Sequence, residues 1–476
     1  MESQNDIFNT KEFLDILSRY ENSQKEGREE YFETKELTDI AEYYYSSGRM
    51  DDLNAVLDYA IRLHPGAALP LVFRGRIALI DEKDVEKARR CVEQITDCSN
   101  LDYHYLKAEI MIADDDVTAA DEYLKAQLDT IDEDEEADYI LDVSTLFIDY
   151  GIADKAAEWL DMSDETTLAD YRELKARIAF TNGDYDLSSQ LFEQLIDDDP
   201  YSGKYWNSLA STQFMDNRIN DAITSSEFSI AINPEDFEAV LNKANGLFSL
   251  GNFAEAMKFY ERYAKLCPKE GAGPLFMGNC LLNMGKAEEA LPYYEEALHK
   301  LQELNLGTTE ALQCLAFTYS QLDRVDEALE CLDKAMALKD SNKNEVLVIK
   351  GHILLEHRRV KEALKEFLEA LESSAYSRDI FFRIGISVYD CGYPAVAYRM
   401  FKSYMDMRRD DNDDSYEGVA YLAACCKYLN RREDYLKYLR LACEKNPDEV
   451  RKILGSEFPM GMEPRDYYDY EAGREA

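Results

Sequence analysis

The sequence predicts an all-α protein built as a solenoid of antiparallel helical hairpins, and three observations lead to this prediction. Proline recurs at a spacing of 34 residues, at Pro200, Pro234 and Pro268. A turn-forming residue recurs in the same period, at Gly183, Asn217, Gly251 and Gly285. Between these marks apolar residues stand three and four apart, as on an amphipathic helix. A fixed period of this length is typical of proteins in which one pair of helices repeats.

Residues 1–33 precede the repeats and hold one amphipathic stretch. Its apolar residues are Phe13, Ile16, Leu17 and Tyr20, which share one helical face. A solenoid needs a cap at each end because its last hydrophobic face is otherwise exposed. We therefore predict an N-terminal helix that covers the first repeat.

The hairpins of residues 34–449 are predicted by pairs of small residues spaced by 12, at which two helices approach closely. The clearest pairs are Ala210 with Ala222, Ala244 with Ala256, Gly278 with Ala290, Ala316 with Ala328, Gly351 with Ala363, and Gly385 with Ala397. The first member can be followed through about twelve repeats, at Ala41, Gly75, Ala108, Ser144, Ala176, Ala210, Ala244, Gly278, Ala316, Gly351, Gly385 and Ala423. Two intervals are longer, and Glu303–Thr309 and Arg408–Asp414 are expected to lengthen a second helix or its loop.

The C-terminal segment, residues 450–476, is predicted as a capping helix followed by an irregular tail. Asn446-Pro447-Asp448 opens the helix, since proline suits the first turn. Beyond Gly455 the chain carries Pro459, Gly461 and Pro464, which favour irregular backbone.

The repeat resembles the tetratricopeptide repeat, whose pattern is an aromatic residue, Leu and a small residue, then Ala, an aromatic residue and a terminal proline. This chain carries the pattern at Trp206, Leu209, Ala210, Ala222 and Pro234, and again at Ala244, Ala256, Tyr260 and Pro268. The resemblance implies a right-handed superhelix of about twelve repeats. It also implies a concave groove, lined by the first helix of each hairpin, that binds a peptide or a partner helix.

The candidate groove residues follow each small crossing residue or lie about one turn on either side of it. They are Arg177, Phe180, Lys204, Asn207, Ser211, Phe214, Asn245, Phe248, Asn279, Asn283 and Gln313. Asn and Gln offer both a donor and an acceptor, so they suit the backbone of an extended peptide. The alternative is structural: Asn245 and Asn279 bond a neighbouring helix, and the phenylalanines pack between repeats. The Lys and Arg clamp of chaperone-binding family members is not predicted, because Arg177 and Lys204 are the only nearby cations.

Charge restricts the partner, because 96 Asp and Glu against 53 Lys and Arg leave a net charge of −43. Such a chain repels nucleic acid and anionic membranes and favours a basic protein or peptide. The sequence has neither a secretory signal nor an apolar run of about 18 residues, so we predict no membrane association and a cytoplasmic location.

The sequence predicts no catalytic residue, metal site or cofactor. Only five histidines occur, which makes a Ser-His-Asp site improbable, and the spacing of His352 and His357 does not suit a chelating pair on a helix. Acidic clusters fall at predicted loops and lack the calcium-loop signature: Asp114–Asp116, Asp132–Glu136, Asp197–Asp199 and Asp410–Asp414. The favoured function is a non-catalytic scaffold that binds a protein or peptide. The alternatives are a regulatory sensor with its tail or a short peptide in the groove, and a metal-dependent enzyme that uses loop carboxylates.

Overall fold

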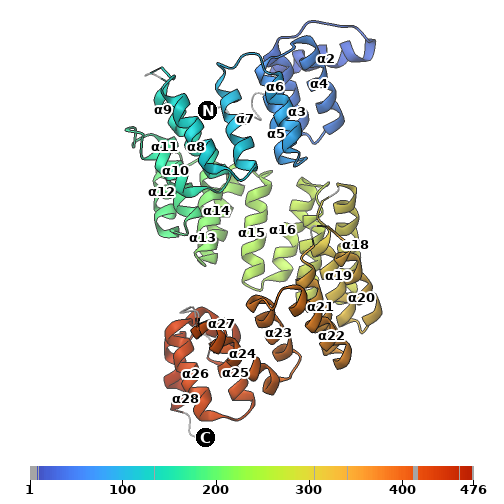
Figure 1. Ribbon diagram of the computed structural model, residues 1–476, viewed down its shortest axis with the longest axis vertical. Helices are drawn as coiled ribbons and strands as arrows, with labels where there is room; N and C mark the ends of the chain where they lie inside the picture. The colour runs from blue at the N-terminus through green and yellow to red at the C-terminus, as the bar shows by residue number, and fades with distance from the viewer. Residues whose placement is uncertain are drawn as a thin grey trace. The chain divides into compact units, whose positions relative to one another are not determined.

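The computed structural model describes residues 8, 10–132, 135–304, 306–339, 341–410, 416–459 and 461–473, with the side chains of 408–410 left out. Within these residues the chain forms 27 α-helices, α2 to α28, and one 3-10 turn, and it forms no strand (Figure 1). The described helices α3 to α26 follow one another as twelve consecutive pairs. The predicted all-α hairpin architecture is therefore confirmed.

The chain divides into two compact units, Met1–Asp221 and Ala222–Ala476, called here the N-terminal and C-terminal units. The helices of the N-terminal unit are α2 (Lys11–Glu26), α3 (Thr34–Ser46), α4 (Met50–Leu63), α5 (Ala68–Ile80), α6 (Val85–Gln94), α7 (Leu101–Ala113), α8 (Val117–Leu128), α9 (Glu136–Asp149), α10 (Ala153–Leu160), α11 (Ala169–Thr181), α12 (Tyr185–Asp198) and α13 (Gly203–Met215). The division falls within α14 (Ile219–Ile232).

The C-terminal unit continues the same pattern of helix pairs. Its helices are α15 (Phe237–Ser249), α16 (Phe253–Leu266), α17 (Ala272–Asn283), α18 (Ala287–Glu303), α19 (Thr309–Gln321), α20 (Val325–Met336), α21 (Lys343–Glu356), α22 (Val360–Ser373), α23 (Arg378–Asp390), α24 (Pro394–Asp410), α25 (Val419–Tyr428), α26 (Arg432–Lys445), α27 (Pro447–Leu454) and α28 (Pro464–Ala472), with the 3-10 turn at Gly455–Glu457.

The small residues of the sequence pattern lie where the two helices of a hairpin cross. A Cβ atom added to Gly278 would lie 2.6 Å from the ring of Tyr294, which stands on the second helix of the same hairpin. In the N-terminal unit the Ser144 hydroxyl donates a hydrogen bond to the carbonyl oxygen of Ala156, 12 residues later, at 2.9 Å. The helices approach so closely that a larger side chain has no room at these positions.

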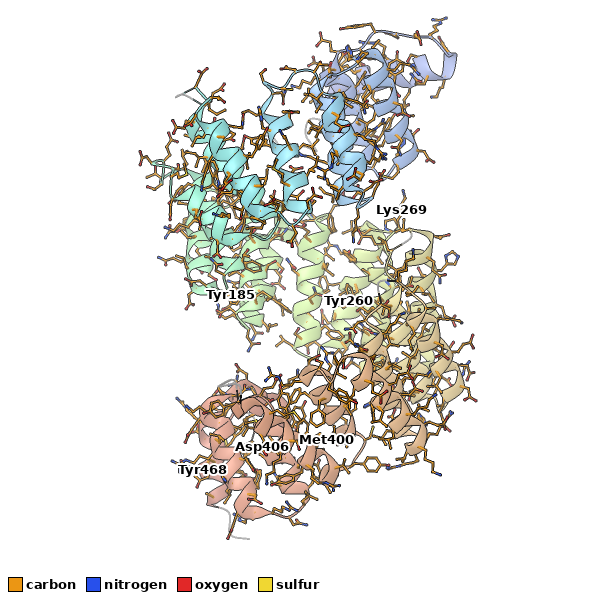
Figure 2. All side chains as sticks on the ribbon, in the orientation of Figure 1. Tyr185, Tyr260, Lys269, Met400, Asp406 and Tyr468 are labelled. Carbon is orange, nitrogen blue, oxygen red and sulfur yellow. The ribbon has the colours of Figure 1, made fainter. Side chains whose placement is uncertain are left out.

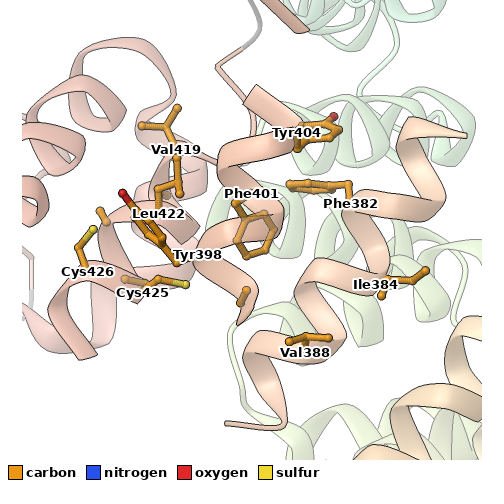
Figure 3. Close-up of a cluster of buried hydrophobic side chains, with 14 of the residues drawn as sticks. Phe382, Ile384, Val388, Tyr398, Phe401, Tyr404, Val419, Leu422, Cys425 and Cys426 are labelled. Atoms are coloured by element: carbon orange, nitrogen blue, oxygen red, sulfur yellow. The ribbon is translucent and has the colours of Figure 1, made fainter. Parts of the chain in front are cut away.

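The core of the C-terminal unit shows how aromatic rings fill the space between these crossings. Phe382 on α23 stacks on Tyr404 of α24 with ring centroids 4.7 Å apart (Figure 3). Phe401 stacks on Tyr421 of α25 with ring centroids 4.8 Å apart. Phe401 is fully buried and a Cβ atom at Gly385 would lie 3.0 Å from its ring. In these hairpins an aromatic residue of the second helix therefore packs onto the small residue of the first helix.

The turns between paired helices carry the second periodic mark of the sequence. Gly251 and Gly285 have φ angles of 77° and 74°, in the left-handed region that glycine adopts without strain. Asn217 has a φ of 59° at the equivalent position, and asparagine is among the few other residues that tolerate this conformation. The recurrence of Gly and Asn every 34 residues thus reflects one repeated turn.

Helices outside the twelve pairs lie at both ends of the described chain. Helix α2 packs on the first hairpin, with Phe13, Leu17 and Tyr20 buried. Asn446 caps α27 by accepting a hydrogen bond from the backbone N–H of Glu449. The prediction of an irregular tail beyond Gly455 is wrong, because residues 464–472 form α28, which packs on α26 and α27.

Each of the two long intervals contains a second helix of 17 residues. Helix α18 has 17 residues where α16 has 14, so the segment that begins at Glu303 follows a lengthened second helix. Helix α24 also has 17 residues, and the remainder of the expected insertion, 411–414, lies outside the described residues. The predicted limits of the solenoid, residues 34 and 449, stay predictions.

Candidate functional site

In the N-terminal unit two of the candidate residues are cations, and each pairs with a carboxylate of a neighbouring first helix. Arg177 on α11 forms an ion pair with Asp149 of α9, and Lys204 on α13 forms one with Glu173 of α11, each at 2.5 Å. These are the only two cations among the predicted groove residues, and each has a carboxylate of the neighbouring first helix as its partner. This pairing stabilises the stack of hairpins and reduces the charge left for a ligand.

A further ion pair of the same kind contains a buried carboxylate. Glu109 on α7, only 7% exposed, accepts two hydrogen bonds from Nε of Arg76 on α5, at 3.1 and 3.3 Å. Burial raises the pKa of Glu109, although Arg76 acts in the opposite direction. The first helices of this unit are thus joined by a series of charge pairs across their exposed edges.

The other predicted residues of the N-terminal unit are largely covered. Asn207 is 7% exposed, and Ser211 and Phe214 are half-buried. Phe180 packs edge-on against Tyr185 of α12, with ring centroids 5.8 Å apart. For this phenylalanine the structure favours the packing alternative.

In the C-terminal unit the candidate asparagines make the same hydrogen bond in two successive hairpins. The hydroxyl of Tyr260 donates to Oδ1 of Asn245 at 2.8 Å, and the hydroxyl of Tyr294 donates to Oδ1 of Asn279 at 2.7 Å. Figure 2 marks Tyr260 on α16. Burial raises the pKa of both tyrosines, so their hydroxyls stay protonated and remain donors at neutral pH.

This bond fixes the orientation of each asparagine side chain. Because Oδ1 faces the tyrosine, Nδ2 points away from it, and within the described residues neither Nδ2 atom has a hydrogen-bond acceptor. The side chain of Cys314 on α19 also reaches Oδ1 of Asn279, at 3.7 Å. Each amide therefore has one end held by the hairpin and two N–H donors that remain unused.

The remaining predicted residues of this unit differ in their contacts and exposure. Asn283 is exposed and donates from Nδ2 to the Asn279 carbonyl of its own helix at 2.9 Å. Phe248 packs edge-on against Phe253 with ring centroids 5.2 Å apart, which again favours packing. Gln313 is half-buried. The two cations among the predicted residues are therefore paired in the N-terminal unit, whereas Asn245 and Asn279 of the C-terminal unit each keep free N–H donors within the described part of the chain.

The C-terminal unit contains a group of hydrogen-bonded serine, histidine and acidic side chains that the sequence does not predict. Nε2 of His357 lies 2.9 Å from the Ser320 hydroxyl, and its Nδ1 lies 3.2 Å from Oδ1 of Asp323. Ser320 also donates to Glu356 at 2.9 Å, and it is only 3% exposed. A buried hydroxyl already held by a carboxylate links the ends of α19 and α21 rather than attacking a substrate. Ser320 is 36 and 37 residues from Glu356 and His357, so no local sequence motif predicts these contacts.

No three His, Cys, Asp or Glu side chains are grouped to hold a metal ion in the part of the chain that the structure describes. Two of the acidic clusters, Asp132–Glu136 and Asp410–Asp414, lie partly outside that part. None of the helices described is both long and apolar enough to cross a membrane.

Family models of the tetratricopeptide repeat match this chain at residues 173–227 and 217–270, at 275–298 and at 308–339. Among curated proteins, the human protein O-mannosyl-transferase TMTC1 is 27% identical over 128 residues, which are 26% of this chain and 14% of that protein. The STIP1 homologue of Dictyostelium discoideum is 27% identical over 107 residues, which are 22% of this chain and 19% of that protein. The matched part therefore spans less than a fifth of either relative.

Solved structures with similar helices include the MamA protein, at 20% identity and a TM-score of 0.32, covering 35% of this chain and 90% of that one. A thermophilic tetratricopeptide repeat protein of Thermus thermophilus is 21% identical with a TM-score of 0.33, covering 40% of this chain and all of that one. The family matches fall on consecutive hairpins whose small crossing residues, left-handed turns and paired helices repeat along the chain. The chain therefore contains tetratricopeptide repeats in these hairpins, within a longer series of similar helical pairs.

Proposed function

We propose that the first-helix face of the C-terminal unit is the site at which this protein-interaction scaffold binds an extended peptide segment of a partner. The residues that we assign to this site are Asn245, Asn279 and Gln313, on α15, α17 and α19. The observation that carries the proposal is the repeated Asn–Tyr hydrogen bond, which presents two oriented amide donors in successive hairpins.

The chemistry of these donors suits a peptide backbone. A backbone carbonyl accepts from an amide N–H whatever side chains the peptide carries, so the contact reads an extended conformation rather than a sequence. Each bond contributes only about 0.5–1.5 kcal/mol net, so several must act together. Because the tyrosines hold the amides in place before binding, little side-chain entropy is lost on contact.

We propose that the bound segment is basic and that the scaffold is non-catalytic. The net charge of −43 attracts cationic chains and raises their association rate. The N-terminal unit contributes to this field, although Arg177 and Lys204 on its first helices are already paired with carboxylates. Screening over about 8 Å at physiological salt confines this attraction to the surface, so affinity depends on the short-range contacts.

The test separates the donor end of each amide from its acceptor end. Asn245→Asp with Asn279→Asp keeps an oxygen for the tyrosine hydroxyl but removes the N–H donors. We expect proteins captured from a lysate at about 300 mM salt by the wild type to be lost from this variant, while its thermal unfolding changes little. Capture is read by mass spectrometry.

Two control variants separate the loss of the N–H donors from the effects of added charge and of lost tyrosine hydroxyls. Gln302→Glu introduces one negative charge, half that of the double variant, at an exposed position of α18 and should retain the partner. Tyr260→Phe with Tyr294→Phe removes the hydroxyls that orient the amides, so it should weaken capture less than loss of the donors does. If the double Asp variant captures the same proteins as the wild type at both low and high salt, the amides are structural and the proposal is wrong.

The sensor alternative, with the protein's own tail as the groove ligand, gains no support from the structure. Residues 464–472 pack as α28 on α26 and α27, where Arg432 donates to the Glu471 carbonyl at 3.0 Å. A helix held there belongs to the end of the solenoid. The metal-enzyme alternative also gains none, since no described cluster of ligands supports it.

A further inference from the structure

Helix α22 exposes an apolar stripe along its outer side. Val360, Leu364 and Leu368 are 46%, 56% and 48% exposed. A spacing of four residues places them one above the other on the helix surface. These three residues are called the α22 stripe. It lies on a second helix, away from the first-helix positions assigned to peptide binding.

Comparison with the other hairpins of the same unit shows that this stripe is unusual. Leu368 stands five residues after the small crossing residue of its helix. At that position the other second helices carry exposed charged side chains, namely Glu261, Glu295, Asp333, Lys402 and Arg440. Leu364 follows the crossing residue directly, and its equivalents Met257, Leu291 and Leu329 are half-buried. Leu368 thus stands where the other helices carry a charged residue, and Leu364 is more exposed than its equivalents.

The packing of the next hairpin explains why Leu364 is uncovered. Helices α17 and α19 each pack broadly on the second helix that precedes them, α16 and α18. Helix α23 instead packs mainly on α21 and touches α22 over a much smaller area. The side of α22 that a following helix would cover is therefore left to solvent. Three large apolar side chains exposed in a row are typical of an interaction surface.

The charges beside the stripe indicate its partner. Lys361 and Lys365 lie in the N-terminal half of α22, whereas Glu369 and Glu372 lie in its C-terminal half. All four are exposed, and none forms an ion pair within the described residues. Other carboxylates of the helix do have partners, since Glu362 pairs with Arg359 at 2.7 Å.

We propose that two copies of the chain associate through antiparallel packing of their α22 stripes. In that arrangement Leu364 of each copy meets Leu368 of the other, so the apolar side chains cover each other. The lysines in the first half of one helix then face the glutamates in the second half of the other. A twofold axis needs a surface that is complementary to itself, and this helix has such a distribution of charge.

The size and charge of the interface set its strength. One helix face is smaller than the ~800 Å² per partner of a typical stable complex, so the dimer forms at micromolar rather than nanomolar concentration. Each copy carries a net charge of −43, and this repulsion opposes association at low salt. Because salt screens the repulsion, added salt should tighten the dimer, whereas it would loosen one held by ion pairs alone.

The first experiment is sedimentation velocity on the full chain between about 1 and 300 μM, at about 50 and 500 mM NaCl. We expect a monomer–dimer equilibrium that shifts toward the dimer at the higher salt. Leu364→Glu with Leu368→Glu should raise the dissociation constant at least about a hundredfold, because charge then replaces the centre of the interface. A matched variant, Ile80→Glu with Leu168→Glu, places the same charges at exposed apolar positions of the N-terminal unit and should leave the equilibrium unchanged. Circular dichroism checks that every variant keeps its helix content.

The second experiment tests the antiparallel arrangement by charge exchange. Lys361→Glu with Lys365→Glu should weaken the dimer about tenfold, and adding Glu369→Lys with Glu372→Lys should restore it, since each half then meets the opposite charge again. A chain that stays monomeric at every concentration and salt would overturn the proposal. So would a dimer that survives the two Leu→Glu changes, or a charge exchange that fails to restore association.

Discussion

Asp121 on α8 shows how a single buried charge is held in the N-terminal unit. It is 5% exposed, accepts a hydrogen bond from Nε1 of Trp159 at 2.9 Å, and forms ion pairs with Lys125 and Lys155 at 2.9 and 3.0 Å. Burial raises the pKa of Asp121, but the hydrogen bonds from the two lysines and from Trp159 outweigh burial and lower it. The charged form is therefore the stable form in the folded protein.

Replacing Asp121 with Asn should destabilise the protein by about 1–3 kcal/mol at neutral pH, because two lysines and the indole lose their charged acceptor. The pKa of Asp121 in the folded protein lies below the ordinary aspartate value of 3.8, so this stabilisation is present above pH 3.8 and is lost as the pH falls through the folded pKa. Urea unfolding followed by tryptophan fluorescence at several pH values measures the difference in the free energy of unfolding. Asp129→Asn, at an exposed position that follows the same helix, is the control. A difference that stays constant down to pH 3 would contradict the assignment.

Residue-level contacts of this kind are the part of the structure that the sequence predicts least. Asp121 and Trp159 are 38 residues apart, and Ser320 and His357 are 37 apart, so neither contact has a local pattern. The tyrosine hydrogen bonds of Asn245 and Asn279 could not be predicted for a related reason. Position shows which face a side chain occupies, but the tyrosine that accompanies it comes from another helix.

At the scale of the helices, the crossing of each hairpin is predictable because one small residue is enough to mark it. Gly351 is the tightest example: a Cβ atom there would overlap the ring of Phe367, which is 6% exposed. Phe367 stands four residues after Ala363, as Tyr294 does after Ala290. A repeated small–aromatic contact therefore sets the distance between the paired helices.

Gly351→Ala should consequently destabilise the C-terminal unit by about 1–3 kcal/mol, even though alanine favours a helix more than glycine does. Thermal unfolding followed by circular dichroism measures the change. Adding Phe367→Leu to the same chain should recover part of the loss, because the smaller side chain makes room for the new methyl group. Stabilisation by Gly351→Ala alone would show that the helices are not in close contact at this position.

Helix α28 is the element that the sequence does not predict, because its prolines and glycine indicate irregular backbone while its packing comes from tertiary contacts. Tyr467 is 2% exposed and stacks on Phe458 with ring centroids 3.8 Å apart. Pro464 stands in the first turn of the helix, where proline is tolerated. Pro464 is therefore compatible with the start of a helix as well as with irregular backbone.

Tyr467→Ala should destabilise the end of the solenoid by about 3–5 kcal/mol, since it removes a buried aromatic ring. Hydrogen exchange should then rise in α25, α26 and α27, which lie beneath or beside this helix. Tyr468→Ala changes the neighbouring, half-buried side chain and should have a smaller effect. Equal exchange in the wild type and in Tyr467→Ala would mean that α28 is not a cap.

At the scale of the whole molecule, the 34-residue period predicts the architecture well because each hairpin follows local rules. The described chain has twelve helix pairs where the sequence indicates about twelve repeats. The sequence does not predict the division into two compact units at residue 221, nor the different first-helix chemistry of the two units. Both depend on contacts between successive hairpins, which the period does not specify.

Stability in a solenoid is close to a sum over hairpins and their neighbouring contacts, so a local change is felt locally. Gly351→Ala should therefore move the unfolding transition seen by circular dichroism more than the transition seen by tryptophan emission. Urea titrations read by both signals on the same samples measure this. Equal shifts in the two signals would show that the whole chain unfolds as one cooperative unit.

The placement of the two tryptophans makes this comparison available without any label. Trp159 lies on α10 and Trp206 on α13, both in the N-terminal unit, and the chain has no other tryptophan. Trp159 is fully buried, so its emission responds to the loss of packing around it. The protein thus carries an intrinsic optical reporter for one part of its length, while the part that bears Asn245, Asn279 and the α22 stripe emits no tryptophan signal of its own.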